Sequence, residues 1–432
     1  MTSPDARAVP VDAISAERLA AQGLTYRTID VSSDADTAAF LRADARGFLG
    51  PEPSAEAIAF DRAMLTERRN IGVFESGAQA QSLPVATVNS WVAPMTVPGG
   101  EIDMWAISSV TVAGTHRRRG VARALLEGEL RAAASARVPL AGLTVTEATI
   151  YGRYGFASAL PMARVTVNTR RAGWAGGAAA GRLEYIERSV LKDAIAELHE
   201  LARNQRAGEI PGWDGRWARL SGLSPASTAP TAVRGVRYLD ANGDVCGVMA
   251  YTLAELDQSF RFELHVQHLI ATAPEALQGL WGFAVQHDLV DRVTANLRPV
   301  DDPIVWLVAD RRGVEVVVHD HGWLRILDVP AALGGRRYRA PLDVVFAVDD
   351  ALGFATGSWR LVVDSTGEAT ASAADGPADI VLDVAALSAL FLGGATATQL
   401  AAAGRLSASD TVAADVDDAF RTVQAPVLSI WY

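Results

Sequence analysis

A strand, a turn and a helix follow one another directly between residues 107 and 134, and this succession limits the possible folds more than any other segment. Val110 and Val112 alternate with polar residues, as in a half-buried strand. Ala113-Gly114-Thr115 turns the chain, and apolar residues recur at helical spacing from Val121 onwards. Such a succession is typical of an α/β fold. The apolar stripe of the predicted helix is Val121, Ala122, Leu125, Leu126, Leu130 and Ala133, and its predicted solvent face is Arg123, Glu127 and Arg131.

The turn before this helix has the composition of an anion-binding site. It reads His116-Arg117-Arg118-Arg119-Gly120-Val121-Ala122. The first N–H groups of a helix have no partner within the helix, and the helix dipole makes that end electropositive, so a pyrophosphate binds there readily. Gly120 lets a ligand approach the backbone, Ala122 avoids crowding, and the arginines add positive charge. The alternative is an exposed arginine run that begins an ordinary amphipathic helix.

Helical and strand patterns alternate along most of the chain. A Gly/Ala-rich stretch at 172–181 interrupts them and is the first candidate for a linker. The second α/β stretch has no Gly-rich phosphate loop, and from Trp323 the pattern changes to short strands with turns. We expect helices at 37–48, 55–67, 189–205, 274–286 and 384–391, and strands at 71–74, 84–91, 104–112, 140–146, 232–239, 245–253, 344–348, 358–364 and 369–373.

Length and composition narrow the class of protein. A chain of 432 residues needs two or three hydrophobic cores, and a hydrophobic fraction of 50% is that of a folded globular protein. The net charge of −11 argues against a nucleic-acid binder and favours a cationic partner. Residues 341–432 hold twelve acidic and three basic side chains, which form either a solvated surface or a field that attracts cations. The single cysteine, Cys246, excludes an intrachain disulfide.

Three further motifs accompany the arginine turn. Residues 146–156 read Thr-Glu-Ala-Thr-Ile-Tyr-Gly-Arg-Tyr-Gly-Phe, residues 325–333 read Arg-Ile-Leu-Asp-Val-Pro-Ala-Ala-Leu, and the sequence ends on Trp431-Tyr432. In this order the motifs resemble the Eis (enhanced intracellular survival) family of GCN5-related N-acetyltransferases (GNATs) over nearly the whole chain. The resemblance implies an α/β (α+β) fold, with two tandem GNAT-like domains of mixed sheets and then a sterol-carrier-like α+β domain. We expect these domains at 1–166, 167–322 and 323–432.

The resemblance also implies the chemistry of the site, with acetyl-CoA as co-substrate in the first domain. Tyr151 aligns with the general acid of the family, and a phenol with a pKa of about 10 is protonated at neutral pH. The terminal carboxylate of Tyr432 is implied as the general base; the alternative is a terminal strand that completes the sheet of the third domain. The residues implied to hold acetyl-CoA are Val110, Thr111, Val112, Arg117, Arg118, Arg119, Gly120, Val121, Ala122, Arg123, Thr146 and Glu147.

The predicted substrate pocket departs from that of the family, whose best-known members acetylate aminoglycosides. The substrate-binding residues implied here are Asp320, Trp431 and Ser109. Aligned to the family, Gly47 stands in place of Asp, Ala57 or a neighbour in place of Trp, Ser109 in place of Phe and Trp431 in place of Glu. The loss of acids weakens attraction for a polycation, which Asp301, Asp302 and the acidic third domain are expected to offset in part.

We therefore expect acetyl transfer to the primary amines of small cationic substrates, namely aminoglycosides or polyamine-like amines. One alternative is acetylation of lysine side chains in proteins or peptides. Another is a carrier or sensor that binds acyl-CoA or lipid without turnover.

The remaining patterns predict little further chemistry. His265-Val266-Gln267-His268 lies in a strand-like stretch, and His319-Asp320-His321 is predicted to form a turn, so no metal site is expected. The first residues lack the pattern of a signal peptide, and no apolar run reaches the roughly 18 residues of a membrane-spanning helix. We expect a cytoplasmic protein and, from the resemblance alone, a homohexamer.

Overall fold

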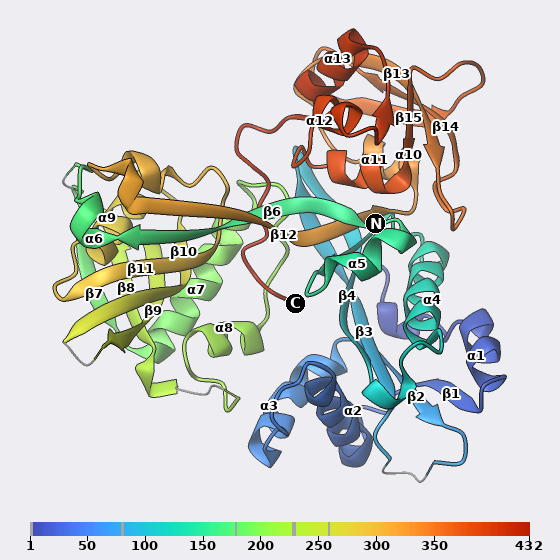
Figure 1. Ribbon diagram of the computed structural model, residues 1–432, viewed down its shortest axis with the longest axis horizontal. Coiled ribbons are helices and arrows are strands. Elements are labelled where there is room, and N and C mark those ends of the chain that lie inside the picture. The colour runs from blue at the N-terminus through green and yellow to red at the C-terminus, as the bar shows by residue number, and fades with distance from the viewer. Residues whose placement is uncertain (1–2, 79–81, 178, 227–229, 258–259) are drawn as a thin grey trace. The chain divides into compact units, whose positions relative to one another are not determined.

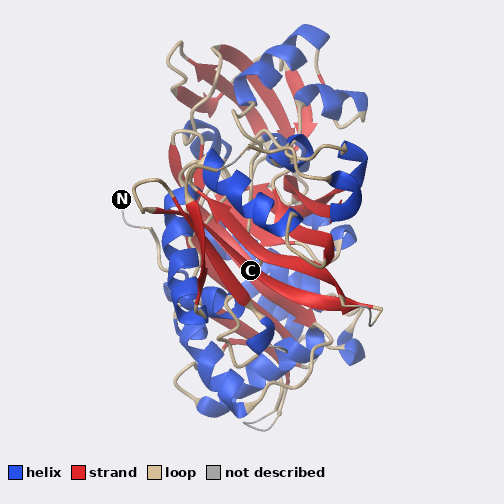
Figure 2. Ribbon diagram, turned by 90° about the vertical axis from the view of Figure 1, so that its left-hand side faces the viewer, coloured by secondary structure: helices blue, strands red, loops and turns tan. Residues whose placement is uncertain are grey.

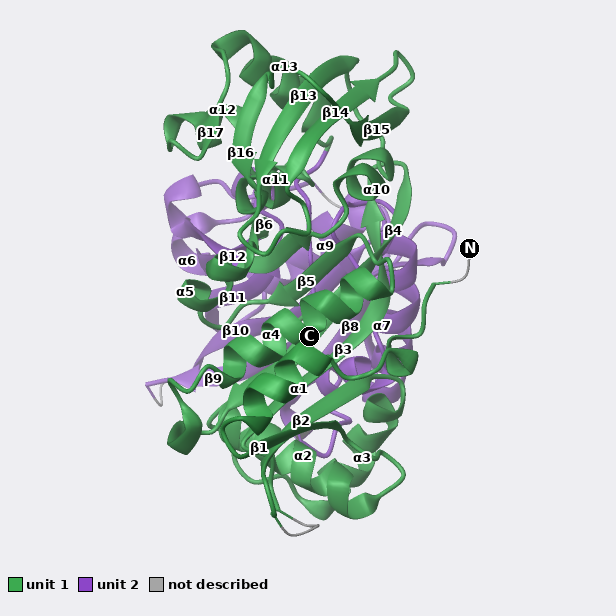
Figure 3. Cartoon of the chain, turned by 90° about the vertical axis from the view of Figure 1, so that its right-hand side faces the viewer, with its two compact units in different colours: residues 1–160, 321–423, 431–432 green, residues 161–320, 424–430 purple. Residues whose placement is uncertain are grey.

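The computed structural model describes residues 3–78, 82–177, 179–226, 230–257 and 260–432. The chain divides into two compact units (Figure 3). Unit 1 comprises residues 1–160, 321–423 and 431–432, and unit 2 comprises residues 161–320 and 424–430. Unit 1 therefore combines segments from both ends of the sequence.

The main sheet of unit 1 has the strand order β1-β2-β3-β4-β5-β12 (Figure 1). β4 and β5 run parallel and are joined by the crossover helix α4, whereas β5 and β12 are antiparallel. The elements are α1 (Ala13–Ala20), β1 (Leu24–Thr28), α2 (Asp34–Gly47), α3 (Ala55–Thr66), β2 (Arg69–Glu75), β3 (Ala86–Val97), β4 (Gly100–Val112), α4 (Val121–Ser135), β5 (Leu140–Thr144), α5 (Ala148–Tyr151) and the end of β12 (Val314–Ile326).

Helices α2 and α4 cover opposite faces of this sheet. Ile71 and Val73 on β2 belong to the core cluster that contains the apolar side chains of α4. Phe74, the next residue of the same strand, packs instead with Phe40 and Leu41 of α2. Successive residues of a strand point to opposite faces, so the two clusters lie on the two sides of the sheet.

The predicted solvent face of α4 is only partly present: Arg123 is exposed, whereas Arg131 is half-buried and Glu127 is buried. Helix α1 packs against α4 and covers it (Figure 1). Arg18 on α1 pairs with Glu127 at 2.9 Å, and Arg131 pairs with Asp12 at 2.7 Å. Glu127 is buried as a result. The charged residues do recur at helical spacing, but Glu127 and Arg131 form ion pairs with α1 and the residue before it instead of facing solvent.

Unit 2 has a sheet of order β6-β11-β10-β9-β8-β7. Its parallel pair is β10 and β11, joined by the crossover helix α9. Helices α7 and α9 pack on β8, β9 and β10. The apolar side chains of α9 join the core cluster of this unit, and Leu191, Ile195 and Leu198 of α7 are buried as well. The elements are the end of β6 (Ala157–Asn168), α6 (Thr169–Ala172), β7 (Arg182–Ile186), α7 (Arg188–Arg203), α8 (Asp214–Leu220), β8 (Arg234–Leu239), β9 (Val245–Leu256), β10 (Arg261–Ala271), α9 (Pro274–Val285) and β11 (Val290–Arg298).

The two sheets repeat one plan. β7 to β11 follow the order of β1 to β5, and the parallel pair with its crossover helix recurs at the same place. Each sheet is completed by a strand from the other half of the sequence, because residues 163–168 of β6 pair with β11 and residues 322–326 of β12 pair with β5. The structure thus shows a kinship that the sequence does not display as a repeat.

The last part of unit 1 is a separate sheet of order β15-β14-β13-β16-β17, with helices packed beside it (Figure 2). Residues 323–326, which open the range predicted for the third domain, belong to the ladder with β5. The elements of this part are α10 (Val329–Gly334), β13 (Leu342–Asp349), β14 (Gly357–Val363), β15 (Ala369–Ala373), β16 (Ile380–Asp383), α11 (Val384–Leu390), α12 (Ala397–Ala402), β17 (Leu406–Ser407) and α13 (Asp410–Phe420).

Two local predictions are corrected by these elements. The Gly/Ala-rich stretch, apart from residue 178, which lies outside the described residues, belongs to unit 2 rather than linking two units. Ala175 and Gly176 donate backbone hydrogen bonds to Leu307 there. The predicted turn His319-Asp320-His321 lies inside strand β12. Most other predicted helices and strands are present, with ends shifted by a few residues.

Candidate active site

Strand β4 carries a bulge where the sequence places Val110, Thr111 and Val112. Thr87 of β3 pairs with Thr111, but Asn89 pairs with Ser108, so β4 holds one extra residue. Ser109 takes a left-handed φ of 53° at this point. Its carbonyl accepts a hydrogen bond from the Thr87 hydroxyl at 2.8 Å, which fixes the bulge.

Beyond the bulge, β4 separates from its parallel neighbour. The ladder between β4 and β5 runs from Met104–Leu140 to Ala106–Gly142. β4 continues to Val112, and within the described residues its last part has no pairing with β5. An unpaired strand edge offers backbone N–H and C=O groups to an extended ligand.

The turn after β4 is shaped as an anion cradle. Arg118 and Gly120 both adopt left-handed conformations, with φ of 62° and 74°. Left-handed residues that alternate with residues of negative φ point successive N–H groups to one side. Gly120 is the residue before the first turn of α4, and a Cβ added to it would meet no atom within 4 Å. The glycine is thus required by its conformation, and the space in front of the helix is open.

The arginines of this turn differ in their engagement. Arg119 donates to the carbonyl of Gln22 at 3.2 Å, and Arg123 pairs with Glu127 at 2.5 Å. Arg117 and Arg118 are exposed and form no ion pair with any residue that the structure describes. These two side chains are the most available cations at the start of α4. The next helical residues, Val121 and Ala122, are buried and half-buried, so the ligand could meet their backbone rather than their side chains.

Tyr151 ends the short helix α5, which follows Thr146 and Glu147 after β5. Its ring packs edge to face on Phe156, with centroids 6.3 Å apart, and the residue is buried. Burial, helped by the charge of Glu147, raises the pKa of the Tyr151 phenol. The phenol therefore keeps its proton at any pH near neutral. Thr146 and Glu147 are exposed.

The last two residues of the sequence lie at the end of β5. The hydroxyl of Thr144 donates to the backbone oxygen of Tyr432 at 2.5 Å, and the N–H of Tyr432 donates back to that hydroxyl at 3.4 Å. The Tyr432 ring packs edge to face on Trp91, with centroids 5.3 Å apart. Residues 421–432 contain no strand, so the alternative of a terminal strand is wrong.

One sheet edge thus gathers most of the predicted site. β4 and β5 are parallel, so their carboxyl ends meet at the same edge, and both the arginine turn and the Tyr151 segment begin there. Tyr432 lies at the same edge through Thr144. Sequence reasoning missed Thr144 and Trp91, which have no motif of their own. The signal available for Thr144 was its position as the last strand residue before the Thr146–Phe156 motif.

The predicted substrate residues are only partly brought together. Trp431 is 38% exposed and packs edge to face on His321, with ring centroids 4.5 Å apart. Ser109 lies at the bulge and accepts a hydrogen bond from Asn89 at 3.3 Å. Asp320 is exposed on β12 and belongs to unit 2.

The two acids expected to offset the loss of negative charge are engaged elsewhere in unit 2. Asp301 pairs with Arg206 at 3.0 Å, and Asp302 pairs with Arg298 at 2.8 Å. Asp302 also accepts the N–H of Ile304.

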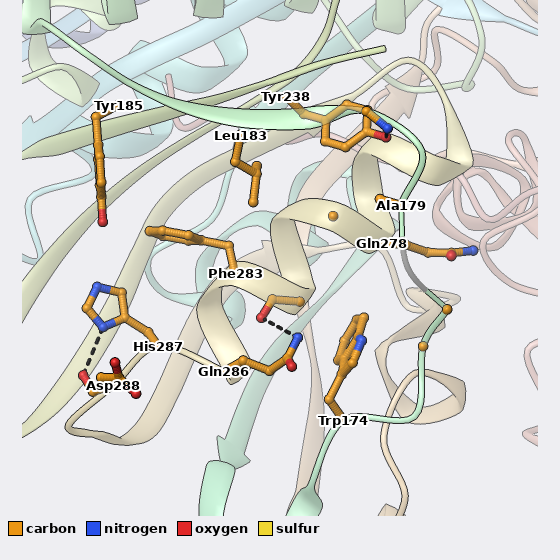
Figure 4. Close-up of a pocket in the computed structure, with 15 residues that line it drawn as sticks. Trp174, Ala179, Leu183, Tyr185, Tyr238, Gln278, Phe283, Gln286, His287 and Asp288 are labelled. Carbon is orange, nitrogen blue, oxygen red and sulfur yellow. Dashed lines mark hydrogen bonds between the residues drawn. The ribbon is translucent and has the colours of Figure 1, made fainter. Parts of the chain in front are cut away.

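Other features of the described residues do not add to this site. They include no group of three or more His, Cys, Asp or Glu side chains placed to hold a metal ion. A pocket of about 740 Å³ lies in unit 2 beside α9 (Figure 4). Trp174, Leu183, Tyr185, Tyr238 and Phe283 line it, and no described lining residue is one that the sequence assigned to acetyl-CoA, catalysis or substrate.

Comparison with known proteins places these features in a family. Residues 28–159 and 211–326 match models of the acetyltransferase (GNAT) domain, and residues 329–429 match the sterol carrier protein domain. An uncharacterized N-acetyltransferase of Streptomyces avermitilis is 34% identical over 401 residues, which cover 90% of this chain and 94% of the relative. The N-acetyltransferase Eis of Mycobacterium tuberculosis is 30% identical over 73% of this chain and 78% of its own length. The chain belongs to the Eis family of GNAT acetyltransferases.

Solved structures agree with this assignment. Eis1 from Mycobacterium abscessus superposes with a TM-score of 0.77 at 28% identity, over 95% of this chain and all of that one. The Eis-family chain is thus an N-acetyltransferase with two GNAT domains and a sterol-carrier domain, and the predicted fold class is confirmed. GNAT domains use acetyl-CoA as co-substrate.

The start of α9 differs from the start of α4. The residue before α9, Ala273, is extended with a φ of −134°, and Pro274 occupies the first turn. Proline lacks an N–H, so this helix start offers one donor fewer and no glycine. The open turn with Arg118 and Gly120 fits a pyrophosphate, and the start of α9 does not.

Proposed function

We propose that this chain transfers the acetyl group of acetyl-CoA to a primary amine of a small cationic substrate, with Tyr151 as general acid and the carboxylate of Tyr432 as general base. The observation that carries the proposal is the hydrogen bond between Thr144 and Tyr432, which joins positions 288 apart in the sequence. It ties the end of the chain to the strand from which the Tyr151 segment begins.

The features of the first domain support a place for acetyl-CoA. The turn from Arg117 to Arg123 would hold the pyrophosphate, with Gly120 giving access to the N–H groups of Val121 and Ala122. The free edge of β4 at Val110, Thr111 and Val112 would hold the pantetheine arm. Thr146 and Glu147 would flank the cofactor after β5. Acetyl-CoA supplies a thioester whose carbonyl carbon the amine attacks.

The chain supplies the proton transfers for this attack. The carboxylate of Tyr432 takes the proton of the substrate ammonium through a water molecule, which leaves a neutral amine. The amine nitrogen bonds to the thioester carbon and releases its extra proton to water, and the carbon–sulfur bond breaks to leave the amide and the thiolate. Tyr151 gives its phenolic proton to the leaving thiolate and regains one from solvent. Its raised pKa suits this role, because the phenol is protonated before the step.

Substrate choice follows from charge. The net charge of −11 favours cationic amines, so aminoglycosides and polyamine-like amines are the proposed substrates, bound near Ser109, Trp431 and Asp320. Release of free CoA from acetyl-CoA, measured with each amine class, tests this. Turnover with lysine peptides alone would favour protein acetylation. Tight lipid binding, with no CoA release in the presence of any amine, would favour a non-catalytic carrier.

Deletion of Tyr432 tests the mechanism. We expect kcat to fall by about 10²–10⁴, the usual contribution of a positioned acid or base, with the Kd of acetyl-CoA nearly unchanged. Tyr432→Phe is the matched control, since it retains the terminal carboxylate and removes only the ring hydroxyl. An unchanged kcat after deletion would remove the terminal base from the mechanism.

The proposal includes a homohexamer in the cytoplasm. Analytical ultracentrifugation of the full chain tests the assembly, and fractionation of cells tests the location. No helix among the described residues is long and apolar enough to cross a membrane.

A further inference from the structure

The segment just before the end of the chain is fastened within unit 2. Residues 424–430 belong to that unit and have no regular secondary structure. The N–H of Val427 donates to the carbonyl of Ala207 at 2.8 Å, and the N–H of Ala425 donates to the carboxylate of Asp301 at 2.9 Å. Val427 is also buried. We call residues 424–430 the tail segment.

The last of these fastenings is made by a buried carboxylate. Both oxygens of Glu209 accept the N–H of Ser429, each at 3.1 Å. Glu209 is 6% exposed, and its burial raises the pKa of the carboxyl, although His199 and Arg206 nearby oppose that shift. A buried acid is costly unless it is hydrogen-bonded. The hydrogen bonds from Ser429 supply that compensation here.

The loop that carries Glu209 is built for this contact. Gly208 has a φ of 102°, a backbone conformation that residues other than glycine rarely adopt. It separates Ala207, whose carbonyl accepts from Val427, from Glu209, whose carboxylate accepts from Ser429. Two consecutive attachment points of the tail segment thus flank one strained glycine.

Fixing Ser429 restricts where the chain can end. Three residue steps separate Ser429 from Tyr432, and an extended chain spans at most about 3.6 Å per residue, so the two Cα atoms are within about 11 Å. Chain ends without such attachments usually fray. The attachment of Ser429 therefore limits how far the Tyr432 carboxylate can move from the tail segment.

We infer that Glu209 is a positioning residue for acetyl transfer: through Ser429 it holds the tail segment and so restricts where the Tyr432 carboxylate can lie. The inference rests on the proposed role of that carboxylate. It assigns a task to the second GNAT domain, whose own helix start lacks the glycine turn of the first.

The test is Glu209→Gln in the full chain. The amide keeps one acceptor oxygen but loses the charge and the second acceptor. We expect kcat to fall about ten- to a hundredfold, as for a reacting group displaced by about 1 Å, with the Kd of acetyl-CoA unchanged. Glu200→Gln is the matched control, because Glu200 lies in the same unit, pairs with Arg203 and does not touch the tail segment.

Two further measurements separate this inference from the proposed function. Carboxypeptidase should release the last residues of Glu209→Gln several-fold faster than those of the parent, which mass spectrometry follows without any activity assay. Combined with deletion of Tyr432, Glu209→Gln should lower kcat no further than the deletion alone. If deletion of Tyr432 leaves kcat unchanged, the proposed base fails. The positioning role fails if the losses in kcat from Glu209→Gln and from the deletion multiply in the combined variant. It also fails if carboxypeptidase releases the last residues of Glu209→Gln no faster than those of the parent.

A second variant covers the case in which Glu209→Gln does not fold. Ser429→Pro removes the N–H donor from the other side of the same contact. It should give the same faster release and the same fall in kcat. Retention of full activity and of a protected end in this variant would overturn the inference.

Discussion

Gly47, at the end of α2, lies so close to Thr111 on β4 that a Cβ atom at Gly47 would overlap the threonine side chain. Thr111 is itself buried and shares a hydrogen bond of 2.6 Å with Thr87. This position therefore has no room for the Asp that the family resemblance implied there. The loss of that acid is built into the packing of α2 on the bulged strand.

Gly47→Asp is expected to destabilise the fold by about 1–3 kcal/mol, the usual cost of overpacking, without creating a useful acid. Urea denaturation measures the free energy of unfolding, and the KM for an aminoglycoside measures the pocket. Gly50→Asp is the matched control. A Cβ at Gly50 would lie 3.4 Å from the Ala45 carbonyl oxygen, which is an ordinary van der Waals contact and no overlap. A lower KM with unchanged stability would contradict this account of Gly47.

Gly120→Ala is expected to weaken acetyl-CoA binding. The left-handed φ of 74° costs a residue with a Cβ about 1–2 kcal/mol, which corresponds to roughly a five- to thirtyfold increase in Kd if the turn relaxes away from the ligand. Isothermal titration calorimetry measures this. Gly114→Ala, the same change six residues before Gly120, should leave Kd unaltered, since Gly114 does not have a left-handed φ and has open space around it.

Tyr151→Phe is expected to lower kcat by about 10²–10⁴ while acetyl-CoA affinity holds. Tyr154→Phe, in the same segment, serves as the matched control. The phenol acts only when protonated, and burial raises its pKa, so the rate should fall on the alkaline side only above the ordinary tyrosine range. Measuring kcat of the parent protein from about pH 6 to strongly alkaline pH checks this. A fall near pH 8, well below about 10, would exclude the tyrosine as the titrating acid.

Asp350→Ala is expected to cost about 3–5 kcal/mol of stability, because it leaves Arg325 as a buried charge without its carboxylate. Arg325 is fully buried and bonds both oxygens of Asp350, at 2.6 and 2.7 Å. It also donates to the carbonyl of Tyr154, so the third domain supports the Tyr151 segment. Urea denaturation monitors the change. Asp343→Ala breaks the exposed pair with Arg360 and should leave stability nearly unaltered.

Local patterns predicted the elements of the site well. The strand, turn and helix around Gly120 stand where periodicity placed them, because a helix start and a left-handed glycine are encoded by neighbouring residues. What the sequence did not reveal depends on long-range contacts. Glu127 reads as a solvent residue until Arg18, 109 positions earlier, is brought against it.

The same reason explains why the segment His319-Asp320-His321 was predicted to be a turn rather than part of a strand. His319-Asp320-His321 looks like a turn by composition, yet it lies in β12, whose end pairs with β5. No local signal marks a strand that joins a sheet nearly two hundred residues away in sequence. The contact of Tyr432 with Thr144 is of this kind as well: the family resemblance implied that the terminal carboxylate lies at the site, but nothing in the sequence pointed to Thr144.

The place of β12 in the sheet has a consequence for how the protein is made. While the ribosome is still translating unit 2, the first domain holds β5 with one open edge, because residues 322–326 do not yet exist. An unpaired edge is prone to pair with other chains, and contacts this distant in sequence form slowly. A fragment that stops at residue 166 inherits that exposed edge permanently, whereas the same fragment supplied with residues 321–326 as a peptide regains a neighbour for β5.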